Sequence, residues 1–143
     1  MANALGLYVH MTVAGGDKAI AWYQSVFGAE VKALHMAEDQ HRVMFAVLTM
    51  FGGHLFISDV FPELVADTQA PSASVPPTCM LHVDFEDPNE VNAVVARAEA
   101  AGALVTMKPE DVYWGDRYGR IRDPFGHVWS FGARAQPQPA NEG

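Results

Sequence analysis

The sequence has little cysteine, few basic side chains and no long hydrophobic run. Its 143 residues include one cysteine, Cys79, so no disulfide can form within the chain. Nine basic residues stand against 17 acidic ones, and the net charge of −8 argues against a nucleic-acid partner, which requires a basic surface. No apolar stretch approaches the roughly 20 residues of a membrane span, and no signal-like leader is recognisable. We therefore expect a cytoplasmic protein without a membrane or nucleic-acid partner.

The first half of the chain is predicted to contain a strand, a helix and three further strands. Half of all residues are hydrophobic, which is enough for the core of a compact domain. Apolar residues alternate over 7–13, a pattern typical of a half-buried strand. A helix is predicted over 17–27, with Asp17 as its N-cap and Gly28 at its end. The strands expected after it are 30–36, 42–50 and 54–58.

The second half is predicted to repeat this order after a connector. Residues 59–77 contain four prolines and fit no regular element. Alternation returns over 79–85, and a helix follows with Asp87 as its cap, Pro88 in its first turn and Gly102 at its end. The strands expected after it are 103–109, 117–123 and 127–131.

The two halves are related by a tandem repeat of about 73 positions. Equivalent residues are His10 and His82, Gly28 and Gly102, and Gly53–His54 and Gly126–His127. The prediction is one α+β domain with two βαβββ modules. Its parts are module one (5–58), the connector (59–77), module two (78–132) and a flexible tail (133–143).

Three segments carry a resemblance to a known family. They are AIAWYQSVFGAE, LFISDVFPE and WGDRYGRIRDPFGHVWSF. With the tandem βαβββ order, they resemble the glyoxalase, bleomycin-resistance and dioxygenase (vicinal oxygen chelate) superfamily, in particular its PhnB-like or glyoxalase-like branch. The resemblance implies that each module forms half of an incomplete barrel and that paired modules enclose a cup for a small-molecule ligand. Exposed apolar edges of such half-barrels favour a homodimer.

Strand periodicity predicts which side chains face the cup. A strand covered by a helix turns its apolar side chains toward the helix, so the alternate side chains point the other way. Trp114 is added as a ligand contact because it lies in a loop at the expected rim of the cup. We expect Cys79 to be buried on the helix side and Leu55 and Ile57 to contribute apolar lining. The predicted substrate contacts are Tyr8, Thr12, Asp84, Trp114, Tyr118, Arg120 and Ser130.

The metal site that the resemblance implies is predicted to be absent. Its four ligand positions correspond to Tyr8, Ile57, Met80 and Ser130, and the last three are poor ligands for a divalent ion. His10 and His82 lie two residues beyond the ligand positions Tyr8 and Met80, so their side chains are also expected to face the cup. They are the candidates for a relocated metal or proton-transfer site that Asp84 would complete, with hydrogen-bonded structural histidines as the alternative.

Three functions remain open from the sequence. The first is a lyase or isomerase for a small oxygenated metabolite, with His10 or His82 as catalytic base or metal ligand. Arg120 then holds an anionic group, unless it pairs with Asp84. The second is a binding protein that sequesters a cationic drug, as bleomycin-resistance relatives do, and the net charge of −8 favours it. The third is a degenerate module whose role is self-association.

Overall fold

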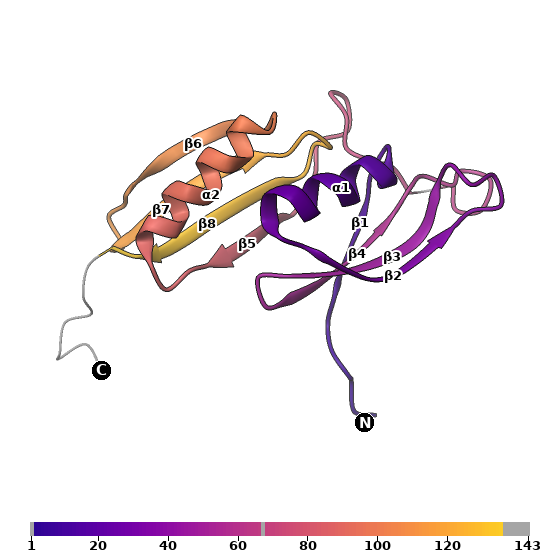
Figure 1. Ribbon diagram of the computed structural model, residues 1–143, viewed down its shortest axis with the longest axis horizontal. Coiled ribbons are helices and arrows are strands. Elements are labelled where there is room, and N and C mark those ends of the chain that lie inside the picture. The colour runs from indigo at the N-terminus through magenta and orange to yellow at the C-terminus, as the bar shows by residue number, and fades with distance from the viewer. Residues whose placement is uncertain (1, 67, 136–143) are drawn as a thin grey trace. The chain divides into compact units, whose positions relative to one another are not determined.

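The computed structural model describes residues 2–66 and 68–135. The chain divides into two compact units, residues 1–75 (unit 1) and 76–143 (unit 2), and the division falls inside the predicted connector. Each unit contains one helix and one four-stranded sheet in the order βαβββ, which confirms the predicted α+β modules (Figure 1). Among the described residues, neither helix is long and apolar enough to cross a membrane.

Unit 1 has a mixed sheet with the strand order β1-β4-β3-β2. The edge strand β1 runs parallel to β4, and the other neighbours are antiparallel. Its elements are β1 (Val9–Thr12), α1 (Gly16–Phe27), β2 (Glu30–Met36), β3 (Val43–Met50) and β4 (Gly53–Ser58). Strand β1 is shorter than predicted, because Leu7 lies outside it and is 98% exposed.

The N-terminus of α1 is capped from elsewhere in the chain, so the prediction that Asp17 is its N-cap is wrong. Gly15 holds the N-cap position with a φ of 92° and has no side chain to offer. The carboxylate of Asp59, just after β4, accepts hydrogen bonds from the backbone N–H groups of Gly15 and Gly16 at 2.8 and 3.0 Å. A Cβ on Gly16 would lie 2.7 Å from Asp59 Oδ2, so this contact requires glycine. At the other end, Gly28 closes the helix with a φ of 68°, as predicted.

Unit 2 repeats this arrangement with the strand order β5-β8-β7-β6, in which β5 runs parallel to β8. Its elements are β5 (Met80–Asp84), α2 (Pro88–Ala100), β6 (Leu104–Asp111), β7 (Asp116–Arg122) and β8 (Val128–Arg134). Asp87 caps α2 as predicted, by accepting a hydrogen bond from the Asn89 N–H. Strand β8 extends to Arg134 and takes in the start of the predicted tail, of which residues 136–143 lie outside the described residues.

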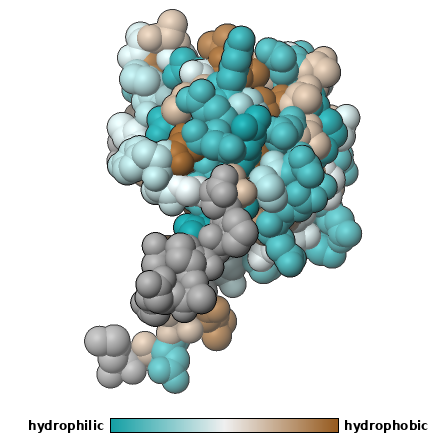
Figure 2. All heavy atoms as spheres, turned by 90° about the vertical axis from the view of Figure 1, so that its left-hand side faces the viewer, coloured by the Kyte–Doolittle hydropathy of each residue, from teal (hydrophilic) through white to brown (hydrophobic). Residues whose placement is uncertain are grey.

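Each sheet has one face covered by the helix of its own unit and one opposite face, called here the open face. The covered face holds apolar side chains, among them Ile121 and Trp129 of unit 2, which are 0% and 2% exposed. Leu55 and Ile57 also belong to the covered face, because Ile57 pairs across the sheet with buried Met11, so the prediction that they line the cup is wrong. Over the surface that Figure 2 shows, hydrophilic side chains predominate, with small hydrophobic areas between them.

The prediction that Cys79 is buried is also wrong, since this cysteine is exposed. It precedes β5, which begins at Met80, so the alternation of the strand does not determine where its side chain points.

Candidate functional site

The open face of unit 2 places His82 between a hydroxyl and a carboxylate. His82 Nδ1 lies 2.7 Å from Ser130 Oγ, and His82 Nε2 lies 2.8 Å from Asp84 Oδ1. The parallel register of β5 and β8 sets Ser130 directly opposite His82. An ionised carboxylate can only accept a hydrogen bond, so Nε2 carries a proton, and in the neutral ring Nδ1 accepts the Ser130 hydroxyl proton.

The three side chains form a line from the interior to the surface. Ser130 is 1% exposed, whereas the side chains of His82 and Asp84 are 45% and 81% exposed. Ser130, expected as a substrate contact, is thus buried beneath His82 and supports the imidazole from below. Gly132, opposite Asp84 on β8, makes room for the pair, because a Cβ there would lie 3.3 Å from His82 Cε1. No pattern in the sequence points to Gly132.

Aromatic side chains and an arginine surround this line. The Tyr118 ring is nearly parallel to the His82 ring with 6.1 Å between centroids, and Trp114 meets Tyr118 edge-on at 5.5 Å. Arg120 Nε donates a hydrogen bond to the Tyr118 hydroxyl at 2.9 Å. Six residues expected at the site are therefore neighbours on one face, and we call them the unit 2 cluster. They are His82, Asp84, Trp114, Tyr118, Arg120 and Ser130.

Arg120 is not in an ion pair with Asp84, which was one of the two predicted alternatives. Asp84 binds His82 instead, and among the described residues of unit 2 no carboxylate lies within ion-pair distance of Arg120. The guanidinium is half-buried, and its hydrogen bond goes to a phenol, so none of the residues described in this unit opposes its charge. A half-buried cation of this kind favours contact with an anion.

The other expected site residues, Tyr8, His10 and Thr12, lie in unit 1. His10 Nε2 is 2.9 Å from Ser58 Oγ, and the two residues are separated by 48 positions, as His82 and Ser130 are. Tyr8 packs beside Phe56 with 5.2 Å between ring centroids. The histidine–serine pair thus occurs in both units, although His10 uses the other ring nitrogen.

The residues at the metal positions implied by the resemblance do not fit a divalent ion. Ile57 is fully buried in the core of unit 1, Met80 offers only a thioether, and Ser130 is buried and bonded to His82. Both ring nitrogens of His82 already have partners. Within residues 2–66 and 68–135, no three or more His, Cys, Asp or Glu side chains are grouped as metal ligands.

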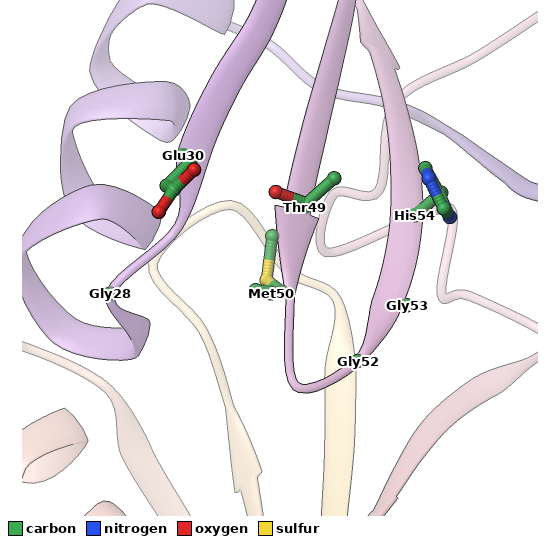
Figure 3. Close-up of a pocket in the computed structure, with 7 residues that line it drawn as sticks. All are labelled: Gly28, Glu30, Thr49, Met50, Gly52, Gly53 and His54. Atoms are coloured by element: carbon green, nitrogen blue, oxygen red, sulfur yellow. The ribbon is translucent and has the colours of Figure 1, made fainter.

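A separate hollow of about 410 Å³ lies at the turn between β3 and β4 in unit 1 (Figure 3). Glu30, Thr49 and His54 follow one another across β2, β3 and β4. Glu30 forms a salt bridge of 2.8 Å with Lys32, whose hydrogen bond and positive charge lower the pKa of the carboxyl. Because Lys32 already neutralises this carboxylate, the hollow offers hydrogen-bonding groups without an unbalanced charge.

Comparison with known proteins identifies relatives over nearly the whole chain. The family model of the glyoxalase/bleomycin resistance protein/dioxygenase superfamily matches residues 7–131. An uncharacterized protein of Mycobacterium bovis is 33% identical over 134 residues, which are 93% of this chain and 82% of the relative. The fold is similar to that of a glyoxalase/bleomycin resistance protein/dioxygenase family enzyme from Burkholderia phytofirmans, with a TM-score of 0.70, 22% identity and coverage of 89% and 96% of the two chains. It is also similar to that of a putative 3-demethylubiquinone-9 3-methyltransferase, PhnB protein, from Bacillus cereus, with a TM-score of 0.68, 17% identity and coverage of 89% and 98%.

Proposed function

The chain belongs to the glyoxalase/bleomycin resistance protein/dioxygenase superfamily, and on that premise we propose that the unit 2 cluster binds a small oxygenated molecule with an anionic group. The observation that carries this proposal is the Arg120 guanidinium, which has no carboxylate partner among the described residues of unit 2. Tyr118 fixes its Nε, so the two Nη groups are left to bind a carboxylate or a similar oxyanion. Trp114 and Tyr118 supply apolar surface for the rest of the ligand.

The proposed chemistry is proton transfer of the kind that lyases and isomerases use, with His82 as the acid or base. The Ser130 hydroxyl can rotate from donor to acceptor, so Nδ1 can also carry a proton. Nε2, beside the exposed Asp84, is then the ring nitrogen that gives a proton to the ligand or takes one from it. When His82 is an imidazolium, the negative charge of the Asp84 carboxylate stabilises its positive charge. Asp84 and Ser130 are positioning residues, since each acts through His82.

The anion site is tested by titrating the protein with pyruvate, malonate and inorganic phosphate and measuring binding by calorimetry. Replacing Arg120 with methionine removes a charge-assisted contact, so affinity should fall by roughly 10-fold to 100-fold. Arg97→Met, an equal loss of charge on the exposed surface of α2, is the control and should change affinity by less than about 2-fold. Equal affinities for the parent and Arg120→Met would refute the anion site.

Proton transfer by His82 has its own test. Hydrogen–deuterium exchange at carbon next to a carbonyl can be followed by NMR for each ligand that binds. His82→Gln should abolish the exchange and leave binding within about 3-fold, since glutamine keeps hydrogen-bonding groups but cannot accept the proton. Exchange that continues at the parent rate in His82→Gln would refute this role.

A binding protein for a cationic drug is the second candidate, and the exposed aromatic pair of unit 2 favours it. Tyr113 is 95% exposed and meets Trp114 edge-on, while the Trp114 indole N–H donates to Asp116. Aromatic faces beside a carboxylate, on a chain with a net charge of −8, suit a cation. In this case bleomycin should raise the melting temperature, Tyr113→Ala should abolish the rise, and Arg120→Met should leave it unchanged.

We also propose that the chain forms a homodimer. Strands β1 and β5 are edges of their own sheets, and Val9 and Met80 on them are 49% and 46% exposed. Light scattering during size-exclusion chromatography should give about twice the mass of 15.6 kDa. A mass equal to that of one chain across the micromolar range would contradict the dimer.

A further inference from the structure

Unit 1 contains a cavity whose chemistry differs from that of the unit 2 cluster. Its volume is about 430 Å³, within the range of roughly 300–1,000 Å³ that is usual for small-molecule sites. One part of the wall is apolar and comes from Met44, Phe61, Leu64 and Val65. The other part is polar and includes the hydrogen-bonded pair of His10 and Ser58, with Thr12 beside it.

The apolar part of the wall is open to solvent. Met44, Leu64 and Val65 are 39%, 65% and 48% exposed, respectively. Single exposed hydrophobic residues are ordinary on protein surfaces, but three of them around one cavity form a surface that a ligand can cover. Covering them removes apolar area from water, which drives the binding of an apolar molecule.

Two charged groups described at the cavity, Asp59 and Arg42, are already hydrogen-bonded or paired. The Asp59 carboxylate lies in its wall but accepts three backbone hydrogen bonds, from Gly15, Gly16 and Val43, and is 7% exposed. Near the rim, the Arg42 guanidinium is paired with the carboxylates on either side of it. These ion pairs are Arg42 with Asp39 at 2.8 Å and Arg42 with Glu63 at 2.7 Å. A charged ligand would therefore lose its hydration without gaining an opposite charge from these two groups.

Arg42 also fixes the segment that forms the apolar wall. Residues 61–65 form a turn in which the N–H groups of Leu64 and Val65 donate to the Phe61 carbonyl. The Arg42 guanidinium lies 4.3 Å from the centre of the Phe61 ring and donates to the Val60 carbonyl at 3.3 Å. The wall is thus held in place before a ligand arrives, which reduces the ordering cost of binding.

We propose that this cavity is a second ligand site, which takes an uncharged, mainly apolar small molecule with one hydroxyl or carbonyl group. The polar group meets the His10–Ser58 pair, because the Ser58 oxygen keeps hydrogen-bonding capacity beyond its contact with His10. The apolar body lies against Leu64, Val65 and Met44. A short-chain alcohol, a ketone or a phenol has this chemistry.

The test uses the neutral fluorescent probe N-phenyl-1-naphthylamine at pH 7, with p-cresol, toluene and benzoate as competitors. The probe should bind saturably, and p-cresol should displace it at least 10-fold better than benzoate, which has similar size but carries a charge. Leu64→Asp should weaken probe binding at least 10-fold. Leu104→Asp is the matched control, because Leu104 is 63% exposed on β6 of unit 2, and it should change binding by less than 2-fold.

A second variant tests the hydrogen-bonding end of the site. Ser58→Ala should reduce the affinity for p-cresol about 5-fold and leave that for toluene unchanged, since toluene lacks the hydroxyl. The absence of saturable binding, or equal losses in Leu64→Asp and Leu104→Asp, would overturn the proposal. Probe binding that survives Leu64→Asp but is lost in Arg120→Met would place the probe at the unit 2 cluster and would also overturn it. Anion binding at Arg120 is measured separately, so either site can fail alone.

Discussion

Replacing Asp59 with asparagine tests the capping of α1 by a residue that follows β4. Asp59 Oδ1 accepts from the N–H groups of Gly15 and Gly16, and Oδ2 accepts from the Val43 N–H at 2.7 Å. Asparagine has one acceptor oxygen, so its NH₂ group must face at least one of these N–H groups. The better orientation keeps both glycine contacts and leaves the Val43 N–H, in the core, without an acceptor.

The expected cost follows from this count. One buried donor without a partner costs about 1–3 kcal/mol, and the remaining bonds lose the strength that the negative charge gave them. We therefore expect Asp59→Asn to lower the free energy of unfolding of unit 1 by roughly 2–4 kcal/mol. This is a large part of the 5–15 kcal/mol that is typical of a whole protein.

Asp17→Asn is the matched control, because it makes the same chemical change at the residue that local sequence rules select as the cap. Asp17 lies in the first turn of α1 and has only its interaction with the helix dipole to lose, about 0.5 kcal/mol. Hydrogen exchange of the α1 amides reports on unit 1 directly, and urea denaturation followed by circular dichroism gives the global value. If Asp59→Asn lowered the free energy of unfolding no more than Asp17→Asn does, the capping argument would be refuted.

Two further predictions concern the unit 2 cluster and the unit 1 cavity. In Gly132→Ala, the new methyl group 3.3 Å from His82 Cε1 should displace the ring, and ¹⁵N NMR should show a weaker preference for the proton on Nε2, at a cost of about 1 kcal/mol in stability. Unchanged His82 ¹⁵N shifts would contradict that contact. Arg42 lowers the pKa of the Glu63 carboxyl, so this ion pair stabilises the fold above the ordinary glutamate pKa of about 4.3 and is lost as pH falls below it. Amide exchange in residues 61–65, corrected for its intrinsic pH dependence, should accelerate between pH 5 and about pH 3, and should be insensitive to pH in Glu63→Gln.

Much of the fold could be predicted because its signals are local. Asp87 and Pro88 mark the start of α2 within two residues, and the positive φ of Gly28 ends α1 where the glycine stands. Alternation placed the strands for the same reason, since a period of two is visible within one segment. The predicted and observed strand boundaries differ where the alternating pattern runs past the end of the strand, as it does at Leu7.

The errors arose where the deciding contact lies far along the chain. Asp17 satisfies every local rule for an N-cap, but Asp59, more than 40 residues away, makes the bonds. Ile57 was assigned to the wrong face because the parity of β4 depends on its pairing with β1 and β3, which the sequence does not state. Cys79 was assigned by extending an alternation that starts only at Met80.

The candidate site shows the same division between local and distant information. His82 and Asp84 are two residues apart on one strand, so the sequence alone predicts that they share a face of the sheet. The same reasoning applies to Tyr118 and Arg120 on β7. The bond between His82 and Ser130 depends on the register of two strands 48 residues apart. Gly132 gave no signal of its own, because its role is to leave space beside a side chain from another strand.

The residue two positions beyond each histidine explains why the two units differ in chemistry. In unit 2 this residue is Asp84, whose carboxylate binds the imidazole and opposes a positive charge on it. In unit 1 it is Thr12, which lies beside Ser58 and brings a hydroxyl but no charge. His10 therefore has no charged partner on its own strand, and the apolar wall of its cavity suits an uncharged ligand. His82 instead has Asp84 as a counter-ion, and Arg120 lies nearby because it is hydrogen-bonded to Tyr118, whose ring stacks on His82. One repeated scaffold can thus present a neutral pocket and an ionic one, because the open face of a sheet can change its side chains without disturbing the covered face that stabilises it.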